Sequence, residues 1–310
     1  VDFDNIIRVL NQIGYDAVCC PDHISAALNA AHESIVLLKN DGILPLKGVR
    51  SLGVIGPNAG NFTALIGNYH GTPDREDTPL NALGAEADRA GFRLHYSLGC
   101  PLASSKEEEL AQENDRMVEA LAVAEVSDVV LLFLGLDETI EGEEQALDGD
   151  MPGGDKDSLR LPKPQQLLME KLVETGKPVV LVMLSGSAMD LRYADEHCAA
   201  ILQAWYPGAR GGTAIADVLF GRVSPSGKLP VTFYRSTEDL PPFTDYAMDN
   251  RTYRYYRGEA LYPFGYGLGY ADIHLDVAKL SGDGESVAAR LTNRSGIAGA
   301  EVVQVYVRDE

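Results

Sequence analysis

The amino-acid sequence predicts an α/β fold, with a mostly parallel sheet and helices on both of its faces, followed by an incomplete antiparallel β-sandwich. Short apolar runs alternate with amphipathic helical segments, which predicts the first part, because parallel strands are buried on both faces and their crossovers are helices. After Tyr270 apolar and polar residues alternate strictly, which is typical of half-buried antiparallel strands.

In the first half of the chain, helices and strands are predicted in turn. Residues 23–39 are predicted to form a helix, because apolar side chains recur there every three or four residues. The apolar run 50–56 ends in glycine and predicts a buried strand. A helix over 82–90, a strand over 93–98 and a helix over 106–124 follow, the last with acidic residues in its first turn, where the helix dipole favours them.

The second half continues with apolar strands and helices. Residues 128–135 are apolar on both faces, as expected of a central strand, and strands are also predicted over 178–186 and 199–205. Pro164 opens a helix that is predicted to end at 175, and a further helix is predicted over 213–220.

Three alternating strands are predicted near the C-terminal end, over 273–280, 286–293 and 301–309. A β-sandwich of this type needs about seven strands and about 100 residues, so we expect this domain to be incomplete. The first residues have neither the Met of a natural start nor the features of a signal peptide. We therefore expect the chain to be a piece of a longer protein.

The charge balance excludes some classes of partner. The 310 residues include 26 Lys and Arg against 46 Asp and Glu, which gives a formal net charge of −20. Such a protein repels phosphate groups and anionic lipids, so nucleic acid is not expected as a partner. No apolar run approaches the roughly 18 residues that a membrane span requires, so no membrane contact is expected either.

The cysteines predict neither a disulfide framework nor a metal site. Cys19 and Cys20 are adjacent, Cys100 and Cys198 are isolated, and the close, repeated spacing of zinc ligands is absent. We interpret all of them as buried or incidental thiols. This usage favours a reducing compartment such as the cytoplasm, with export through a segment upstream of Val1 as the alternative.

The acidic loop after the central strand is the main candidate site. Ligands of open α/β sheets bind beyond the carboxyl ends of the strands, which directs attention to the loops after Gly56, Gly135, Gly186 and Pro207. The loop 137–157 contains nine acidic residues and one Lys. Three interpretations are open: a solvated acidic loop, a calcium site, or a carboxylate that acts as a general acid at the rim of a sugar pocket. The calcium-loop pattern is not met.

Other catalytic patterns are absent or incomplete. Neither phosphate-binding glycine pattern is present, and Met189 stands where a serine-hydrolase elbow requires glycine. The histidines are scattered, and only His70, in the loop IGNYHGTP, has a position that suggests a role. The aromatic residues of 251–270 are of the kind that stacks on sugars or packs between domains.

Several long segments carry a family resemblance: AAHESIVLLKNDGILPL (30–46), IGPNA, IGNYHGTP, GLDETIEGEE, AILQAWYPGARGGTAIADVLFGRVSPSGKLPVTFY (200–234) and LYPFGYGLGY (261–270). With these motifs the chain resembles the C-terminal region of glycoside hydrolase family 3, the β-glucosidases and β-xylosidases of plant polysaccharide breakdown. GAEVVQVYVRD (299–309) resembles the fibronectin type III-like domain that follows in this family.

The resemblance implies a division of the chain into a poorly matched connector over 1–29, an α/β domain over 30–268 and a truncated fibronectin type III-like domain over 269–310. It also implies an upstream TIM barrel that bears a nucleophilic Asp, with the active site between barrel and α/β domain. Neither a cofactor nor a metal is implied.

Glu141 is the acid/base that the resemblance implies, because it lies six residues past the glycine that ends the strand. Glu143 and Glu144 are close enough that a different alignment of the loop would select one of them. A general acid needs a raised pKa, which like charges and desolvation supply, and Glu138, Glu143 and Glu144 are plausible neighbours for this purpose. Retaining hydrolysis uses two carboxyl groups roughly 5 Å apart, one as nucleophile and one as acid/base.

The sugar is expected to contact Tyr69, His70 and Glu143. The sequence thus predicts the acid/base part of a retaining β-glycosidase that hydrolyses terminal non-reducing sugars from plant-type oligosaccharides. Its partners are the glycoside substrate and the upstream barrel, and the fragment alone is expected to be inactive. The alternatives are a non-catalytic carbohydrate-binding or structural module and, less favoured because the phosphate fingerprint is absent, a nucleotide-binding domain.

Overall fold

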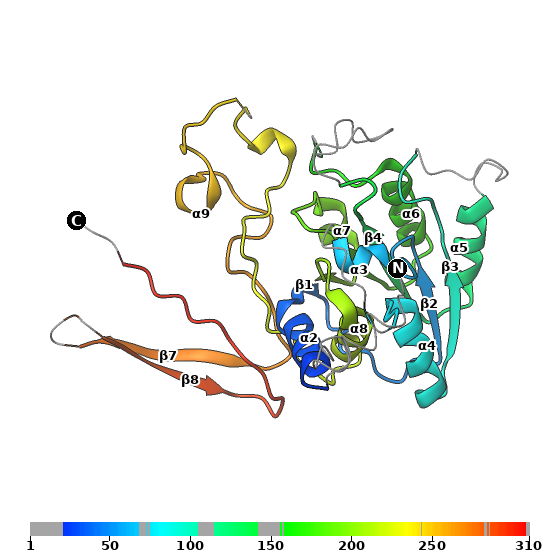
Figure 1. The fold of residues 1–310 in the computed structure, drawn as a ribbon, viewed down its shortest axis with the longest axis horizontal. Coiled ribbons are helices and arrows are strands. Elements are labelled where there is room, and N and C mark those ends of the chain that lie inside the picture. Colours follow the sequence, from blue (N-terminus) through cyan, green and yellow to red (C-terminus); the bar gives the residue numbers. More distant parts are fainter. Residues whose placement is uncertain are drawn as a thin grey trace, which may run out of the picture.

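The computed structural model describes residues 21–67, 73, 75–104, 115–141, 156, 158–242, 244–281, 284 and 286–307. Its main body is a six-stranded sheet between two layers of helices, and a β-hairpin extends away from this body (Figure 1). This confirms the predicted α/β class. Within the described ranges, no helix combines the length and the apolar character that crossing a membrane requires.

The sheet is parallel except at one edge. Its spatial order is β1-β6-β5-β4-β2-β3, and only the β1–β6 pair is antiparallel. The strands are β1 (Val36–Asn40), β2 (Ser51–Ile55), β3 (Arg93–Ser97), β4 (Val129–Gly135), β5 (Val179–Leu184) and β6 (Ala200–Gln203). The runs 50–56, 93–98, 128–135, 178–186 and 199–205 are therefore confirmed as strands.

Helices cover both faces of the sheet, as predicted. The buried side chains of one face form a single cluster with those of α5 (Asp115–Glu125), α6 (Lys163–Glu174) and α7 (Arg192–His197). The other face packs against α2 (Pro21–Ser34), α3 (Thr63–Ile66), α4 (Pro79–Ala90) and α8 (Gly211–Leu219).

Strand β4 shows how the two cores are separated. Leu132 and Leu134 belong to the cluster with α6, while Leu131 and Phe133 belong to the cluster with α8. Successive side chains of a strand point to opposite faces, so a strand that is apolar throughout contributes to both cores. All seven residues of β4 are buried.

The first predicted helix, over 23–39, is wrong only over its last five residues, 35–39. The helix α2 ends at Ser34, and residues 36–40 form the edge strand β1. Val36, Leu37 and Leu38 are consecutive buried residues that alternate between the two cores, which a strand permits and a one-sided helix does not. The run IVLL therefore marks a strand, and its pairing with β6 prevails over the helical spacing of the residues before it.

The remaining helices follow the sequence expectation with shifted ends. The segments predicted over 82–90, 164–175 and 213–220 correspond to α4, α6 and α8. The helix predicted over 106–124 is described from Asp115 as α5, and residues 105–114 lie outside the described residues. The sequence did not predict α3, α7, the 3-10 turns η3 (Gly208–Arg210) and η4 (Thr237–Asp239) or α9 (Thr252–Tyr255).

The C-terminal region contains two of its three predicted strands. β7 (Ile273–Leu280) and β8 (Val287–Asn293) pair antiparallel, as the alternation predicts. The third prediction is wrong over 301–307, which form no strand, while 308–310 lie outside the described residues. A strand needs a neighbour for its hydrogen bonds, and a sequence pattern alone does not supply one.

The order of the strands creates a point where two loops diverge. β3 lies outside β2 on one side, and β4 lies next to β2 on the other, so the chain reverses its direction of winding between β2 and β4. Crevices for ligands form at such points, at the carboxyl ends of the strands. The loops after β2 and β4 are thus the first places to look for a site.

The end of β4 is tightly enclosed. Gly135 has a positive φ of 146°, and a Cβ there would lie 1.8 Å from the carbonyl oxygen of Leu184. The buried Gln165 side chain accepts a hydrogen bond from the Gly135 N–H at 2.8 Å and donates one to its carbonyl oxygen at 2.7 Å. Gly135 therefore fixes where β4 stops and the following loop begins.

We expect Gly135→Ala to lower the free energy of unfolding by about 2–5 kcal/mol, because the added methyl combines backbone strain with overpacking against β5. The matched control is Gly176→Ala. Gly176 also has a positive φ, of 73°, but a Cβ there meets nothing within 4 Å. This control should lose only about 1 kcal/mol from the left-handed backbone. Equal losses in urea unfolding would contradict the steric argument.

Candidate active site

The loop after β4 turns immediately after the strand. The backbone N–H groups of Ile140 and Glu141 both donate to the carbonyl oxygen of Asp137, at 3.1 and 2.9 Å. This tight turn brings Glu141 back to the carboxyl edge of the sheet. The position of Glu141 thus depends on Asp137, four residues earlier.

The Asp137 carboxylate connects the loop after β4 to the loop after β2. Its side chain is buried, with 3% of the residue exposed. One oxygen accepts from Asn61 Nδ2 at 2.7 Å and from Thr63 Oγ1 at 3.2 Å. The other accepts from the backbone N–H and the hydroxyl of Thr139, at 2.8 and 2.6 Å. A buried carboxylate needs such donors, and here they tie α3 to the turn that bears Glu141.

Both oxygens of the Glu141 carboxylate accept hydrogen bonds from hydroxyl groups. Ser187 Oγ donates to Oε1 at 2.6 Å, and Tyr206 Oη donates to Oε2 at 2.5 Å. Ser187 follows β5 and Tyr206 follows β6. Two of the loops that the sequence predicted as candidate sites, those after Gly135 and Gly186, therefore meet at this carboxylate, together with Tyr206, which directly precedes the predicted loop after Pro207.

The Tyr206 hydroxyl is held in its neutral, donating form. Burial raises the pKa of Tyr206 far above its ordinary value, and the charge and hydrogen bond of Glu141 add to this effect. Asp137 contributes in the same direction from a greater distance. The tyrosine therefore acts as a proton donor in a hydrogen bond and does not ionise at neutral pH.

Lys156 adds a positive charge near the same carboxylate. Its ammonium group donates to the carbonyl oxygen of Ala188 and lies 3.3 Å from Met189 Sδ. Burial lowers the pKa of Lys156 to about 8, and the nearby Glu141 carboxylate opposes part of that shift. Ala188 follows Ser187 directly, so the lysine supports the same loop that donates to Glu141.

This arrangement can hold and release one proton at a fixed place. A carboxyl group can take up one proton and give it back, and the hydroxyl groups of Ser187 and Tyr206 hold this one in place. Among the residues that the structure describes, no group of three or more His, Cys, Asp and Glu side chains is placed to hold a metal ion. The chemistry that the site offers is proton transfer.

The predicted site residues have different outcomes. Glu141 lies where the loops converge. Tyr69, His70, Glu143 and Glu144 lie outside the described residues, and their predicted roles stay predictions.

The sequence did not single out Asp137, Ser187 and Tyr206. Ser187 lies in a segment that fails the serine-hydrolase pattern at Met189, and Tyr206 lies within the long family motif 200–234. The signal that could have found them is their position, since each lies two or three residues past the carboxyl end of a strand.

The cysteines that the structure describes are buried thiols, as predicted. Burial raises the pKa of both Cys100 and Cys198 to about 12, so they remain protonated and unreactive. Cys19 and Cys20 lie outside the described residues.

The aromatic segment 251–270 divides into two parts. Tyr262 donates to Asp195 and Tyr270 to the carbonyl oxygen of Val218, so these rings anchor the segment to the α/β domain. Tyr253 stacks on Phe264 at 4.2 Å between ring centroids and stays 42% exposed. Tyr262 and Tyr270 therefore have a packing role. For the exposed Tyr253, contact with a sugar or with another domain stays a prediction.

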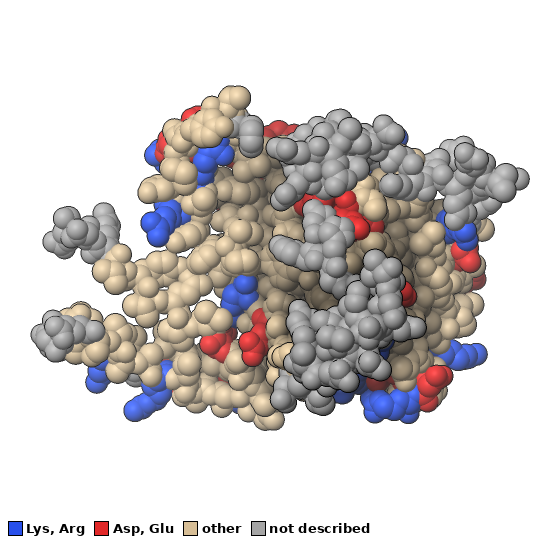
Figure 2. Space-filling model, viewed as in Figure 1, with Lys and Arg blue, Asp and Glu red and all other residues tan. Residues whose placement is uncertain are grey.

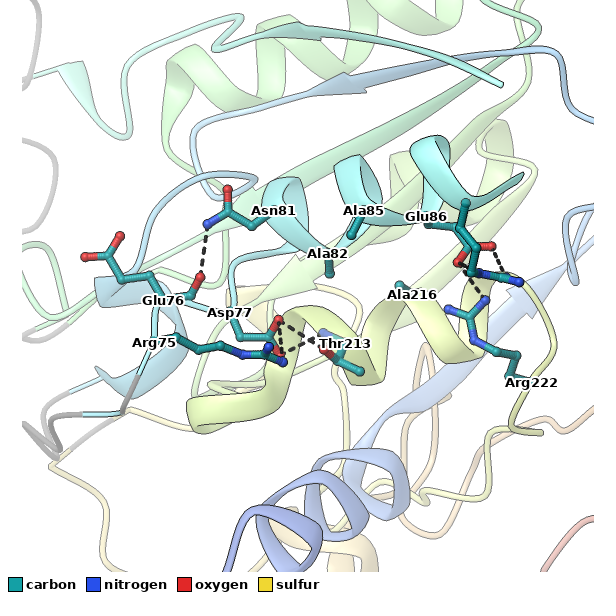
Figure 3. A pocket seen from close by; sticks show the side chains of 11 residues that line it. Arg75, Glu76, Asp77, Asn81, Ala82, Ala85, Glu86, Thr213, Ala216 and Arg222 are labelled. Atoms are coloured by element: carbon teal, nitrogen blue, oxygen red, sulfur yellow. Dashed lines mark hydrogen bonds and ion pairs between the residues drawn. The ribbon is translucent and has the colours of Figure 1, made fainter. Parts of the chain in front are cut away.

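A pocket of about 310 Å³ lies between α4 and α8 (Figure 3), and Glu141 is not among the residues that line it. Several of its charged side chains are paired. Arg222 contacts Glu86 at 2.9 Å and Asp217 at 2.5 Å, and Asp77 accepts from the backbone N–H of Thr213 near the start of α8. These pairs hold the two helices together. Figure 2 likewise shows acidic and basic side chains next to one another at several places on the surface.

Comparison with known proteins gives consistent results. Residues 35–270 match the model of the glycosyl hydrolase family 3 C-terminal domain. The chain is 35% identical, over 96% of its length, to the probable β-D-xylosidase 7 of Arabidopsis thaliana, and 33% identical, over 93% of its length, to a periplasmic β-glucosidase of Salmonella typhimurium. It spans 40% and 41% of these two relatives.

A solved structure shows the same fold. The family 3 β-glucosidase of Bifidobacterium adolescentis superimposes with a TM-score of 0.75 and 30% identity, over 94% of this chain and 44% of that chain.

The burial of Lys156 predicts a pH dependence of stability. Because the pKa of Lys156 falls to about 8 in the folded state from 10.5, the unfolded chain binds more protons between these values, and stability rises with pH across this window. In Lys156→Met this contribution is removed. The stability of wild type relative to the variant should therefore increase from pH 8 to pH 10.5 in urea unfolding.

Lys171→Met serves as the control with the opposite sign. The hydrogen bond to Glu174 raises the pKa of Lys171, so its contribution is present at lower pH and is lost as the pH rises above 10.5. A difference between wild type and Lys156→Met that stays constant over the whole range would contradict the buried ammonium.

Proposed function

The chain belongs to glycosyl hydrolase family 3, and from this premise we propose that it supplies the general acid/base of a retaining β-glycosidase, with Glu141 as that residue. The observation that carries the proposal is the convergence of the loops after β4, β5 and β6 on the Glu141 carboxylate. A carboxyl group held at the edge of the sheet between two hydroxyl donors suits a group that gives and takes one proton.

The proposed reaction has two steps. Glu141, in its protonated form, transfers its proton to the leaving glycosidic oxygen while a carboxylate on another domain attacks the anomeric carbon. The ionised Glu141 then takes a proton from the water that releases the sugar. Ser187 and Tyr206 stabilise the carboxylate that remains after the first transfer, because they donate to both of its oxygens.

The substrate and the partners follow from the relatives. Two of them carry the names β-D-xylosidase and β-glucosidase, so we propose β-xylosides or β-glucosides of plant-type oligosaccharides as substrates. The nucleophile is assigned to an upstream TIM barrel, as the family resemblance implies, and the chain spans only 40% of its Arabidopsis relative, which leaves room for such a domain. Tyr69, His70 and Glu143 are proposed to contact the sugar.

The domain division is part of the proposal. We assign 30–268 to the α/β domain, 1–29 to the connector from the barrel, and 269–310 to the start of a fibronectin type III-like domain. The pairing of β7 with β8 supports the last assignment, because such domains are built from antiparallel hairpins.

In the full-length protein, Glu141→Gln is expected to reduce hydrolysis of alkyl β-glycosides by about a hundredfold or more, the usual contribution of general acid catalysis. The amide keeps the size of the side chain but cannot donate a carboxylic proton. The loss should be smaller for 2,4-dinitrophenyl glycosides, whose leaving group departs without protonation. The measurement is kcat/KM for both substrates.

Glu196→Gln is the matched control. Glu196 is 73% exposed on α7, which ends just before the amino end of β6, at the opposite edge of the sheet from Glu141. It should leave both rates unchanged. Wild-type turnover of alkyl glycosides by Glu141→Gln would refute the assignment and favour a non-catalytic module.

The purified chain by itself is expected to show no turnover of aryl β-glycosides above the rate of buffer, because a proton donor without a nucleophile provides only part of the acceleration. Adding the upstream part of the protein should restore hydrolysis. Turnover by the chain alone that Glu141→Gln abolishes would mean that the nucleophile lies within these 310 residues.

A further inference from the structure

Tyr206 is enclosed between two glycines. A Cβ at Gly186 would lie 2.9 Å from Tyr206 Cε2, and one at Gly67 would lie 2.6 Å from Cδ2. Gly67 has a φ of +53° and is the last described residue before the segment that contains Tyr69 and His70. Any larger residue at either glycine would displace the ring, so both loops leave room for this one side chain.

The backbone before Tyr206 is held in an unfavourable conformation. Trp205 has a φ of +59°, which an aromatic residue adopts only when its surroundings impose it. Trp205 Nε1 donates to the carbonyl oxygen of Ser34 at 3.0 Å, and its ring packs edge-on against Phe233. These contacts fix the left-handed turn that directs Tyr206 toward Glu141.

Strained backbone of this kind is concentrated at functional sites. Without the turn at Trp205, the chain leaving β6 would continue in another direction, and the hydroxyl would not reach the Glu141 carboxylate. Three features thus fix the position of the Tyr206 hydroxyl: the two glycines that enclose the ring, the strained backbone of Trp205, and the hydrogen bond of 2.5 Å to Glu141.

On the premise of the proposed function, we infer that Tyr206 is a positioning residue for Glu141, because its hydroxyl holds Oε2 of the carboxylate in place. A hydrogen bond donated to a carboxylate stabilises the charge, so it makes the proton easier to release to the leaving oxygen.

The pH profile of hydrolysis depends on the polar and charged groups that surround the Glu141 carboxylate. Tyr206 and Ser187 donate to it, Lys156 acts on it by charge, and Asp137 lies at the start of the same turn. Burial and the Glu141 charge raise the pKa of Tyr206, so this residue does not titrate in the working range. Removing its hydroxyl therefore takes one hydrogen-bond donor from the Glu141 carboxylate and adds no new titrating group.

The test is Tyr206→Phe in the full-length protein, beside Glu141→Gln. We expect kcat/KM for alkyl β-glycosides to fall about tenfold, the size of one hydrogen bond to a charged group, with a smaller loss for dinitrophenyl glycosides and little change in KM. The basic limb of the pH profile should move to higher pH, because the carboxyl group keeps its proton longer.

Tyr262→Phe is the matched control. Tyr262 also donates its hydroxyl to a carboxylate, that of Asp195, at 2.6 Å, but it is placed outside the site. It should leave the leaving-group dependence and the pH profile as in wild type, whatever it does to stability. This separates a local effect on Glu141 from a general loss of a buried hydroxyl.

A second variant keeps the test decisive if Tyr206→Phe does not fold. Replacing Tyr206 with 3-fluorotyrosine retains the hydroxyl and makes it a stronger donor, so the basic limb should move to lower pH. If the Tyr206 variants that fold keep the wild-type pH profile and leaving-group dependence, the inference about Tyr206 is wrong. The loss of activity in Glu141→Gln would still support the proposed function in that case. Wild-type activity of Glu141→Gln would end both.

Discussion

The candidate site depends on a single buried carboxylate, that of Asp137, which holds together two loops that leave the sheet in diverging directions. The loop after β2 reaches it through Asn61 and Thr63, and the turn after β4 reaches it through Thr139. Burying this charge without its donors would be strongly unfavourable, so the donors and the carboxylate fix one another. These contacts also fix the position of Glu141, because its backbone N–H donates to the Asp137 carbonyl oxygen.

The apolar sheet below provides the rigidity that the polar edge lacks. β4 is buried along its whole length and ends at Gly135, where Gln165 closes the last backbone groups of the strand. The polar residues begin directly after this point. A sharp boundary between dry core and hydrogen-bonded rim is what allows a short turn to aim a carboxyl group reproducibly. After β6, the left-handed backbone of Trp205 likewise fixes the direction of the chain, here through a strained conformation.

The sequence predicted the parts of the structure that local patterns determine. The apolar strands and the loops at their carboxyl ends followed from hydrophobic runs, and Glu141 followed from the family resemblance. The edge strand β1 was missed because the helical spacing before it continues into IVLL, and only pairing with β6 decides the outcome. Ser187 and Tyr206 were missed because their contact with Glu141 joins residues 46 and 65 positions away in the chain.

The antiparallel edge strand has a further consequence for how this domain combines with others. The backbone N–H of Leu268 donates to the carbonyl oxygen of Leu37, so the entry and the exit of the α/β unit lie side by side at one margin of the sheet. Units whose ends are adjacent tolerate circular permutation and insertion into a host chain. The modules that flank such a unit can therefore be exchanged without rebuilding its interior.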